Sequence, residues 1–407
     1  MLVIVEFAAL TWLSRFSQPP TAVLLVAYGA AFGCYLGLLA YARETRLPLW
    51  TLFAAAVLLR LPWMFTGVSL SDDIWRYLHD GRAQLAGINP FLYAPADSAA
   101  AAYAGPEHAL INNPELPTIY PPFAQLMFHL SALMGASVLS WKIIIVLFDL
   151  GIAGGLIPLL RRRGLPAGLV AAYLFHPLPI VEFAGNGHVD AIAICTMILA
   201  LALVGPHTIM AGVALAASVA AKYLALPLGP FLLRNLSGRD RVKLILAGTA
   251  ALALFYARFT DPLPIGSLGV FARTFTFNGP IAAGLSGLIT PAAARWFTGL
   301  TLLALLTGLW VRNRDPVDVA LLLIAAVLLC SPIVHPWYVT WLVPFLALRR
   351  DPWVVAWTGT VVFAYAVLPQ WWTAQIWHLP TWALVLEYLP VYALAAAAVL
   401  GAIRRRS

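Results

Sequence analysis

The chain has 407 residues, of which 62% are hydrophobic and only 10% are charged. A soluble domain carries charge on roughly a quarter of its residues, so this composition excludes a water-exposed globule and makes lipid the solvent for most of the surface. The formal net charge is +8. Its basic residues stand in short clusters between apolar runs, which indicates membrane orientation and not a nucleic-acid partner.

Apolar runs of about 20 residues, the length that crosses a bilayer, recur along the chain. The first 16 residues lack a basic leader and a small-residue cleavage site, so we interpret them as a retained membrane segment. Arg60 lies inside an apolar run and needs a partner, for which Asp149 is a candidate. The other candidate membrane helices are residues 21–42, 48–70, 141–160, 165–182, 188–204, 242–259, 292–311, 316–332, 337–348, 352–369 and 381–403.

Basic clusters between the apolar runs fix the orientation of the chain, because Lys and Arg gather on the cytoplasmic side of a membrane. Placing all of them inside puts residues 71–118 outside. Residues 120–139 then cannot span, because the next basic cluster would otherwise end outside, so we place them along the outer interface. The clusters are residues 43–46, 161–163, 234–243, 312–314, 349–350 and 404–406.

The same reasoning makes residues 208–233 a hairpin with Lys222 near its outer tip, and it leaves residues 281–290 outside as too short to cross. The prediction is an all-α, polytopic transmembrane protein with about 12 to 14 membrane helices, outer-face interfacial helices and both termini in the cytoplasm. Residues 1–407 form a single integral-membrane domain, in which residues 71–139 are the first outer loop.

The densest group of outer polar residues, at 71–82, follows directly on a membrane helix. Ser71 suits a helix N-cap, and Asp72 and Asp73 suit a first helical turn. A capped, solvated helix accounts for one aspartate there better than for two. We therefore predict that this pair supplies a general base whose charge Arg76 tunes, and we leave open which aspartate it is.

The sequence gives little support for a required cofactor or for a nucleotide-linked substrate. Two adjacent carboxylates could hold a divalent cation, but no further acidic cluster of metal-site type is evident, so we predict no metal site and no required cofactor. No glycine-rich phosphate loop and no serine elbow is present. A nucleotide-linked sugar is therefore unsupported as a donor. An enzyme on the outer face needs a donor already delivered across the bilayer, and a polyprenyl-phosphate sugar fits this requirement.

Further polar residues stand at other outer turns. His188 and Asp190 lie where ionisable groups near lipid are costly and usually functional, although a helix cap also explains Asp190. Lys222 either snorkels to the interface or binds a lipid phosphate, and the sequence does not decide between the two. His335, between two prolines, suits hydrogen bonding to a phosphate or a sugar, or acid–base work, while the plain alternative is an interfacial histidine at a helix break.

At these residues the chain resembles the GT-C superfamily of integral-membrane glycosyltransferases. More narrowly, it resembles the bacterial polyprenyl-phosphate-mannose-dependent mannosyltransferases of the glycosyltransferase family 87 type. The matching segments reach across most of the chain. They are Asp72-Asp73-Ile74-Trp75-Arg76-Tyr77 with Asp80-Gly81-Arg82, Gly87-Ile88-Asn89-Pro90, Tyr120-Pro121-Pro122 and His335-Pro336-Trp337-Tyr338, with Asn186-Gly187-His188-Val189-Asp190 and Lys222 in support.

The resemblance implies an inverting transfer of a hexose, mannose by analogy, from a polyprenyl-phosphate donor. It places the enzyme in the bacterial inner membrane with its active site on the outer face, and it makes Asp72 or Asp73 the base that deprotonates the acceptor hydroxyl. We expect an envelope glycolipid or glycan as acceptor, membrane lipid as surroundings and no nucleic acid. The expected donor- or acceptor-binding residues are Arg76, Tyr77, Asp80, Arg82, Asn89, Tyr120, His188, Asp190, Lys222, His335 and Tyr338.

Two other functions compete with this interpretation. A lipid-linked-sugar flippase or transporter predicts polar residues along a path through the body, whereas the sequence concentrates them at the outer face. A non-catalytic subunit of an envelope-assembly complex predicts stable co-purification with a partner and no turnover of lipid-linked sugar.

Overall fold

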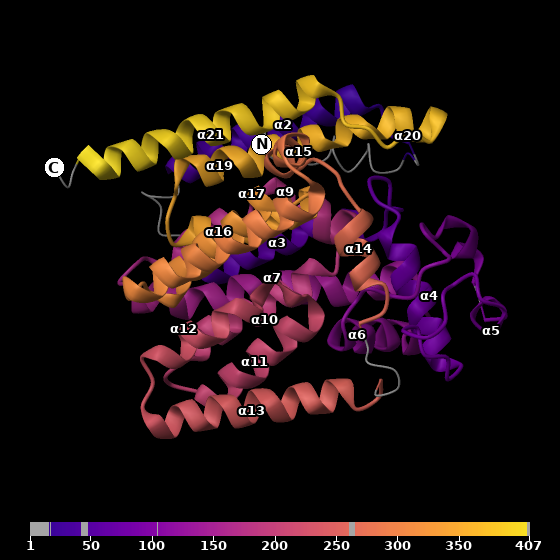
Figure 1. Ribbon diagram of the computed structural model, residues 1–407, viewed down its shortest axis with the longest axis horizontal. Helices are drawn as coiled ribbons and strands as arrows, with labels where there is room; N and C mark the ends of the chain where they lie inside the picture. The colour runs from indigo at the N-terminus through magenta and orange to yellow at the C-terminus, as the bar shows by residue number, and fades with distance from the viewer. Residues whose placement is uncertain (1–15, 17, 42–47, 104, 260–264, 405–407) are drawn as a thin grey trace.

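The computed structural model describes residue 16 and residues 18–41, 48–103, 105–259 and 265–404 (Figure 1). All regular elements in these ranges are helical, and strand-like pairing is limited to an isolated bridge between Phe277 and Ile333. The predicted all-α fold is therefore confirmed. Apart from Phe16, the membrane segment expected over the first 16 residues lies outside the described residues, as does the basic cluster 43–46.

Long apolar helices form the body of the molecule, and α7, α13, α16 and α21 lie roughly along the horizontal of Figure 1. Five spans are long and apolar enough to cross a membrane. They lie in α2 (Thr21–Tyr41), in α7 (Val138–Arg162), in α16 (Pro291–Val311), in α19 (Pro352–Thr360) continued by η6 (Val361–Val367) and α20 (Leu368–Ala374), and in α21 (Thr381–Arg404).

Shorter helices fill the space between these spans. Four of them are apolar and have 10–17 residues: α3 (Leu49–Met64), α10 (Asp190–Leu203), α11 (Thr208–Ala221) and α17 (Pro316–Cys330). Helix α13 (Gly238–Tyr256) packs along α11, which also packs along α10. The chain breaks after α11 at Lys222, the residue that the sequence placed at the tip of a hairpin.

Several predicted spans are broken by prolines. Residues 167–185 form η2 (Ala167–Val170), α8 (Ala171–Leu174), α9 (Pro177–Pro179) and the π-helical η3 (Ile180–Gly185), and this stretch bends by 54°. Proline lacks a backbone N–H and clashes with the preceding turn, so Pro177 and Pro179 interrupt the helix. Pro227 and Pro344 likewise lie in the 3₁₀ segments η4 (Tyr223–Leu228), which precedes α12 (Gly229–Arg234), and η5 (Thr340–Ala347), which follows α18 (Pro336–Val339).

Length and composition therefore give fewer spans than the sequence suggested. The described residues hold five spans, or six with the bent pair, whereas we expected about 12 to 14 membrane helices. The difference arises because broken or short apolar helices fall below the usual spanning length. A helix sheltered by its neighbours can cross with fewer residues.

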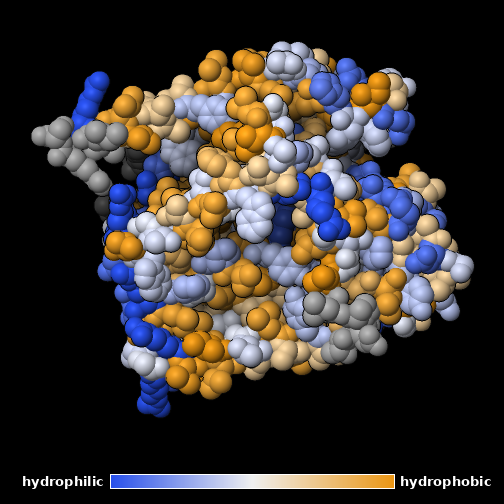
Figure 2. Space-filling view, in the orientation of Figure 1, coloured by the Kyte–Doolittle hydropathy of each residue, from blue (hydrophilic) through white to orange (hydrophobic). Residues whose placement is uncertain are grey.

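Basic residues from distant parts of the chain meet at one end of the body. Arg163 at the end of α7 pairs with Asp315 (2.6 Å) and Arg349 pairs with Asp318 (3.3 Å), both at the start of α17. Arg234 of α12 bonds the carbonyl of Trp310 near the end of α16. Figure 2 shows a row of strongly hydrophilic residues along the left edge, where α7 ends and α13 begins in Figure 1.

The opposite end carries the elements that the sequence assigned to the first outer loop. They are α4 (Asp73–Leu85), α5 (Ser98–Ala101), η1 (Pro106–Leu110) and α6 (Pro122–Leu133), at the right of Figure 1. Helix α6 packs against α4, α7, α11 and α13. With 12 residues it is too short to cross a bilayer. This agrees with the expectation that residues 120–139 do not span.

An ion pair between α3 and α7 lies inside the body. Arg60 Nε is 2.5 Å from Asp149 Oδ2, and both side chains are fully buried. Tyr173 donates to Asp149 Oδ1 (2.5 Å), and Arg60 also donates to the carbonyl of Leu174 (2.9 Å). The expected partner of Arg60 is confirmed, and its satisfied polar atoms make the burial of two charges tolerable.

Candidate active site

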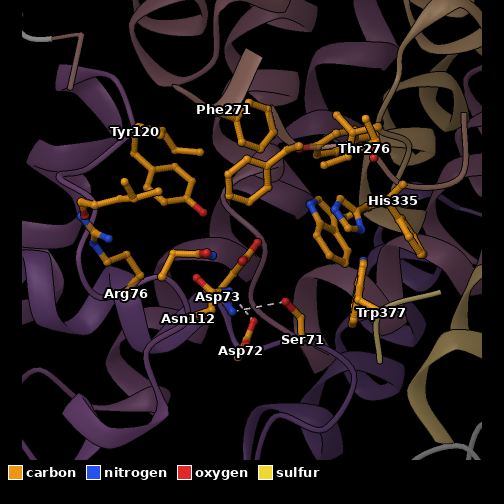
Figure 3. A pocket seen from close by; sticks show the side chains of 18 of the residues that line it. Ser71, Asp72, Asp73, Arg76, Asn112, Tyr120, Phe271, Thr276, His335 and Trp377 are labelled. Atoms are coloured by element: carbon orange, nitrogen blue, oxygen red, sulfur yellow. Dashed lines mark hydrogen bonds between the residues drawn. The ribbon is translucent and has the colours of Figure 1, made fainter. Parts of the chain in front are cut away.

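A pocket of about 350 Å³ opens at the end of the molecule that carries α4. Figure 3 shows Arg76, Asn112 and Tyr120 on one side of it and Thr276, His335 and Trp377 on the other. The first side, the acidic wall, comes from residues 70–76 and 112–120. The second side, the aromatic wall, comes from residues 271–277, 333–338 and 371–377.

The acidic wall begins where α4 begins. Asp72 takes the N-cap position by its backbone but its side chain does not cap the helix. Ser71 Oγ instead accepts a hydrogen bond from the Asp73 N–H (3.3 Å), so the N-cap predicted at Ser71 is wrong by one residue. Both carboxylates are thereby left to face the pocket, and Asp72 Oδ1 accepts a hydrogen bond from Asn112 Nδ2 (2.6 Å).

Electrostatics distinguish the two aspartates. Burial raises the pKa of Asp73 to about 7, helped by the negative charges of Asp72 and Asp190 and opposed by Asn112 and Lys222. Burial also raises the pKa of Asp72, which the hydrogen bond from Asn112 opposes. A carboxyl group whose pKa lies near neutral is matched to accept a proton at physiological pH.

Buried hydrogen-bond partners hold Arg76 in the acidic wall. Its Nε lies 2.8 Å from Asp80 Oδ1, and its Nη2 donates to the carbonyl of Leu116 (2.9 Å). Gln125 donates to the other oxygen of Asp80 (2.8 Å). Asp80 is 1% exposed and does not line the pocket, so it holds Arg76 in place and cannot touch a ligand there.

Three further residues predicted to bind donor or acceptor also lie outside the pocket lining. Tyr77 stacks on Phe128, with ring centroids 4.8 Å apart. Arg82 pairs with Glu107 and donates to the carbonyl of Ala136 (2.7 Å). Asn89 Oδ1 accepts from the N–H two residues on (3.0 Å), which is an Asx turn. These contacts are structural.

The aromatic wall is built from stacked rings. His335 lies between Trp337 and Phe277, with centroid distances of 4.2 Å and 4.9 Å and an angle of 3° to the Trp337 plane. Two backbone hydrogen bonds, Phe277 N–H to Pro332 (2.9 Å) and Val334 N–H to Phe277 (2.8 Å), tie the contributing segments together. Burial lowers the pKa of His335 to about 3, so its neutral ring offers one hydrogen-bond donor and no charge.

Lys222 lies directly behind Tyr338. Its Nζ is 2.6 Å from Asp190 Oδ1 and 4.0 Å from the centroid of the Tyr338 ring, which lines the pocket. Trp341 donates to the same oxygen of Asp190 (2.6 Å). Asp190 is 1% exposed and lies outside the lining, whereas 28% of the Lys222 side chain is exposed. A cation held in this way can attract an anionic group that enters beside Tyr338.

His188 also lies behind the lining. It is fully buried, its ring stacks on Trp337 at 3.9 Å, and it stands between Asp73 and Glu182. Some of the site residues predicted from the sequence therefore line the pocket, and the others lie behind it or away from it. Those that line the pocket are Asp72, Asp73, Arg76, Tyr120, His335 and Tyr338.

Sequence reasoning missed much of the lining. Asn112 and Asn113 precede a proline and had only a turn signal. Phe271, Phe277 and Trp377 lie between candidate membrane helices, but no periodicity singles them out. Within the described residues, no group of three or more His, Cys, Asp or Glu side chains is arranged to hold a metal ion.

Comparison with known proteins supports the expected relationship. Residues 3–237 match the family model of the MptA/MptB family, described as alpha-(1->6)-mannopyranosyltransferase, N-terminal domain. No significant match is found among curated proteins or among solved structures. The matched range covers more than half of the chain, includes the acidic wall and fits a GT-C mannosyltransferase. The chain therefore belongs to the alpha-(1->6)-mannopyranosyltransferase family.

Proposed function

We propose that the protein transfers a mannosyl group from a polyprenyl-phosphate donor to a hydroxyl of an envelope glycolipid or glycan, on the outer face of the bacterial inner membrane and with inversion at the anomeric carbon. The observation that carries this proposal is Asp73. It lines the pocket, and its pKa is raised to about 7. A carboxylate of that kind suits the removal of a proton from a sugar hydroxyl during attack.

The step we propose is a single displacement. Asp73 takes the proton of the acceptor hydroxyl as the acceptor oxygen bonds to the anomeric carbon. The bond from that carbon to the phosphate oxygen breaks, and its electron pair leaves on the polyprenyl phosphate. Lys222, with Arg76, favours the negative charge of the leaving group. A β-linked mannosyl phosphate thus gives an α-mannoside.

The lipid nature of the donor is supported by the rim of the pocket. Trp377 lines the pocket and is 42% exposed, so the aromatic wall continues to the molecular surface. Helix α14 (Leu268–Thr274), which supplies Phe271 to the lining, has no buried residue. A polyprenyl chain in the membrane could approach along such an apolar rim, whereas a nucleotide would find no phosphate loop in the sequence.

Sidedness is supported by the distribution of charge. Arg163, Arg234 and Arg349 lie at one end of the body, and the pocket opens at the end that carries α4. By the positive-inside rule, the basic end faces the cytoplasm and the pocket faces out. Labelling of single cysteines placed at Asn113 and at Asn313 with a membrane-impermeant reagent tests this: we expect Asn113 to react in intact spheroplasts and Asn313 to stay protected. The reverse pattern would end the proposal.

The enzymatic test uses the purified full chain with polyprenyl-phosphate mannose and a membrane extract as acceptor, and detects products by mass spectrometry. We expect one added hexose that depends on this donor, and none from nucleotide-linked mannose. Reconstituted liposomes distinguish the competing functions. Movement of the lipid-linked sugar without transfer would identify a flippase, and neither movement nor transfer would point to a non-catalytic subunit.

A further inference from the structure

His188 is buried behind the pocket between two carboxyl groups. Its Nδ1 lies 3.7 Å from Asp73 Oδ2, and its Nε2 lies 3.4 Å from Glu182 Oε2. Both ring nitrogens and Glu182 Oε2 lack a hydrogen-bond partner among the described residues. Buried polar atoms almost always have partners, so three unpartnered atoms in a row behind the proposed base require an explanation.

The turn that carries His188 is firmly held. Asn186 Oδ1 accepts from the N–H of Leu70 (3.3 Å), and Trp141 Nε1 donates to the carbonyl of Gly187 (2.6 Å). Gly187 has φ +73°, and a Cβ there would lie 3.1 Å from the Trp141 side chain. With its ring stacked on Trp337, the imidazole therefore has little freedom to point elsewhere.

The protonation states of these groups determine which atom donates and which atom accepts each hydrogen bond. Burial lowers the pKa of His188 well below its ordinary value, helped by Lys222 and His335, so the ring is neutral with one donor and one acceptor. The acceptor nitrogen must therefore face a protonated carboxyl group. Glu182 is fully buried, whereas 20% of the Asp73 side chain is exposed, so the cost of burying charge favours the proton on Glu182.

We propose that Tyr365, Glu182 and His188 form a chain of hydrogen-bond donors that ends on Asp73, with His188 as a positioning residue for the base. Tyr365 donates to Glu182 Oε1 (2.6 Å). Glu182 Oε2–H then points to His188 Nε2, and His188 Nδ1–H points to Asp73 Oδ2. The two gaps exceed a hydrogen bond, and they shorten when substrate fills the pocket, as active-site hydrogen bonds do.

This chain of hydrogen-bond donors orients the Asp73 carboxylate toward the acceptor and stabilises its charged form. It thereby opposes burial and the repulsion of Asp72, and it keeps the base ionised at neutral pH. The inference rests on the proposed function, because it gives a partner to the proposed base. The other titratable groups that face Asp73 are Asp72, Asp190, Lys222, Tyr77, Tyr120 and Tyr338.

The test is the pH profile of kcat/KM for mannosyl transfer by the purified full chain. His188→Leu removes the donor, so we expect kcat/KM to fall about 100-fold and the acid limb to move to higher pH. His188→Asn places an amide near the position of Nδ1, so we expect it to recover part of the rate and to return the limb toward that of the wild type.

Two further variants separate this role from a structural one. His176 is also fully buried, with its ring 4.5 Å from the Tyr35 ring, but its ring nitrogens pair with Thr358 (3.0 Å) and with the N–H of Leu178 (3.1 Å) and not with a carboxyl group. We expect His176→Leu to lower thermal stability without moving the limb. Glu182→Gln keeps an uncharged donor toward His188, so its limb should stay in place. An ionised Glu182 would instead give a limb at lower pH, because a negative charge near Asp73 would be lost.

The inference is overturned if both His188 variants keep the wild-type limb, if His176→Leu moves it equally, or if the Glu182→Gln limb moves to lower pH. Failure of the proposed function has a different signature, because the wild-type chain then transfers no mannose or Asp73→Asn remains active.

Discussion

The two walls of the pocket are built in different ways. The acidic wall lies within the range that matches the family model and is held by directional bonds, such as those from Arg76 and Gln125 to Asp80. The aromatic wall lies beyond that range and is held by ring stacking and by the bridge between Phe277 and Ile333. Directional bonds hold a single atom at a defined position, whereas ring stacking holds a flat surface and allows it to slide.

This difference suggests a division of labour. A proton transfer needs a base placed within a few tenths of an ångström, which a network of hydrogen bonds and ion pairs can provide. A sugar ring or a prenyl chain needs a flat apolar face and tolerates small shifts. We therefore expect substitutions in the acidic wall to change kcat and substitutions in the aromatic wall to change KM.

The largest effect is expected from Asp73→Asn. The amide has nearly the same shape but cannot accept the proton, so kcat should fall by about 1,000-fold with little change in KM. Single-turnover transfer with labelled donor measures this. Thermal unfolding should change little, because the amide keeps the size of the carboxyl group and only the charge in the first turn of α4 is lost. Full activity in this variant would remove the chemical role of the acidic wall.

Lys222→Met tests the charge that lies behind Tyr338 of the aromatic wall. Loss of the cation removes an attraction for the phosphate of the proposed donor and also leaves Asp190 buried without its ion-pair partner, so we expect kcat/KM to fall about 100-fold. The double variant Lys222→Met with Asp190→Asn removes both charges. Recovery of stability without recovery of activity would assign the loss to the phosphate, and recovery of both would reduce Lys222 to a structural partner.

The sequence predicted the parts that depend on composition and on local pattern. Hydropathy indicated the all-α body. The ion pair of Arg163 with Asp315 agrees with the placement of the basic clusters 161–163 and 312–314 on the same side. The need of Arg60 for a partner pointed to Asp149. In each case the free-energy cost of placing a charge in lipid leaves few possible structures.

The rest depends on tertiary structure that no local pattern encodes. His188 and Asp190 are near the proposed base, but behind the lining and not in it, because the turn that carries them packs under Leu70. Lys142, which donates to the carbonyls of Trp63 and Thr66 at the end of α3, gave no signal within its apolar run. The sequence analysis predicts single straight helices where the structure has broken ones, because a proline indicates a break in a helix but not the angle of the bend.

Trp377→Ala tests the aromatic wall with a smaller expected effect. The ring lines the pocket at its exposed rim, so its loss should raise KM for the lipid-linked donor about tenfold, equivalent to about 1.4 kcal/mol, and leave kcat nearly unchanged. Trp296→Ala is a matched control, because Trp296 is 75% exposed on α16 and does not line the pocket. A fall in kcat with constant KM would contradict the division between the walls.

The smallest effect is expected from Asp72→Asn, and it appears in the pH profile. The negative charge of Asp72 helps to raise the pKa of Asp73 to about 7, so its removal should lower that pKa. Since the ionised Asp73 is the proposed active form, the acid limb of kcat/KM should move to lower pH, while the rate well above pH 7 stays within about threefold of the wild type. Asp72 would then tune the base without replacing it. If Asp72→Asn instead abolished transfer at every pH while Asp73→Asn retained it, the two aspartates would have to exchange roles, and the buried chain through His188 would serve a residue that does not take the proton.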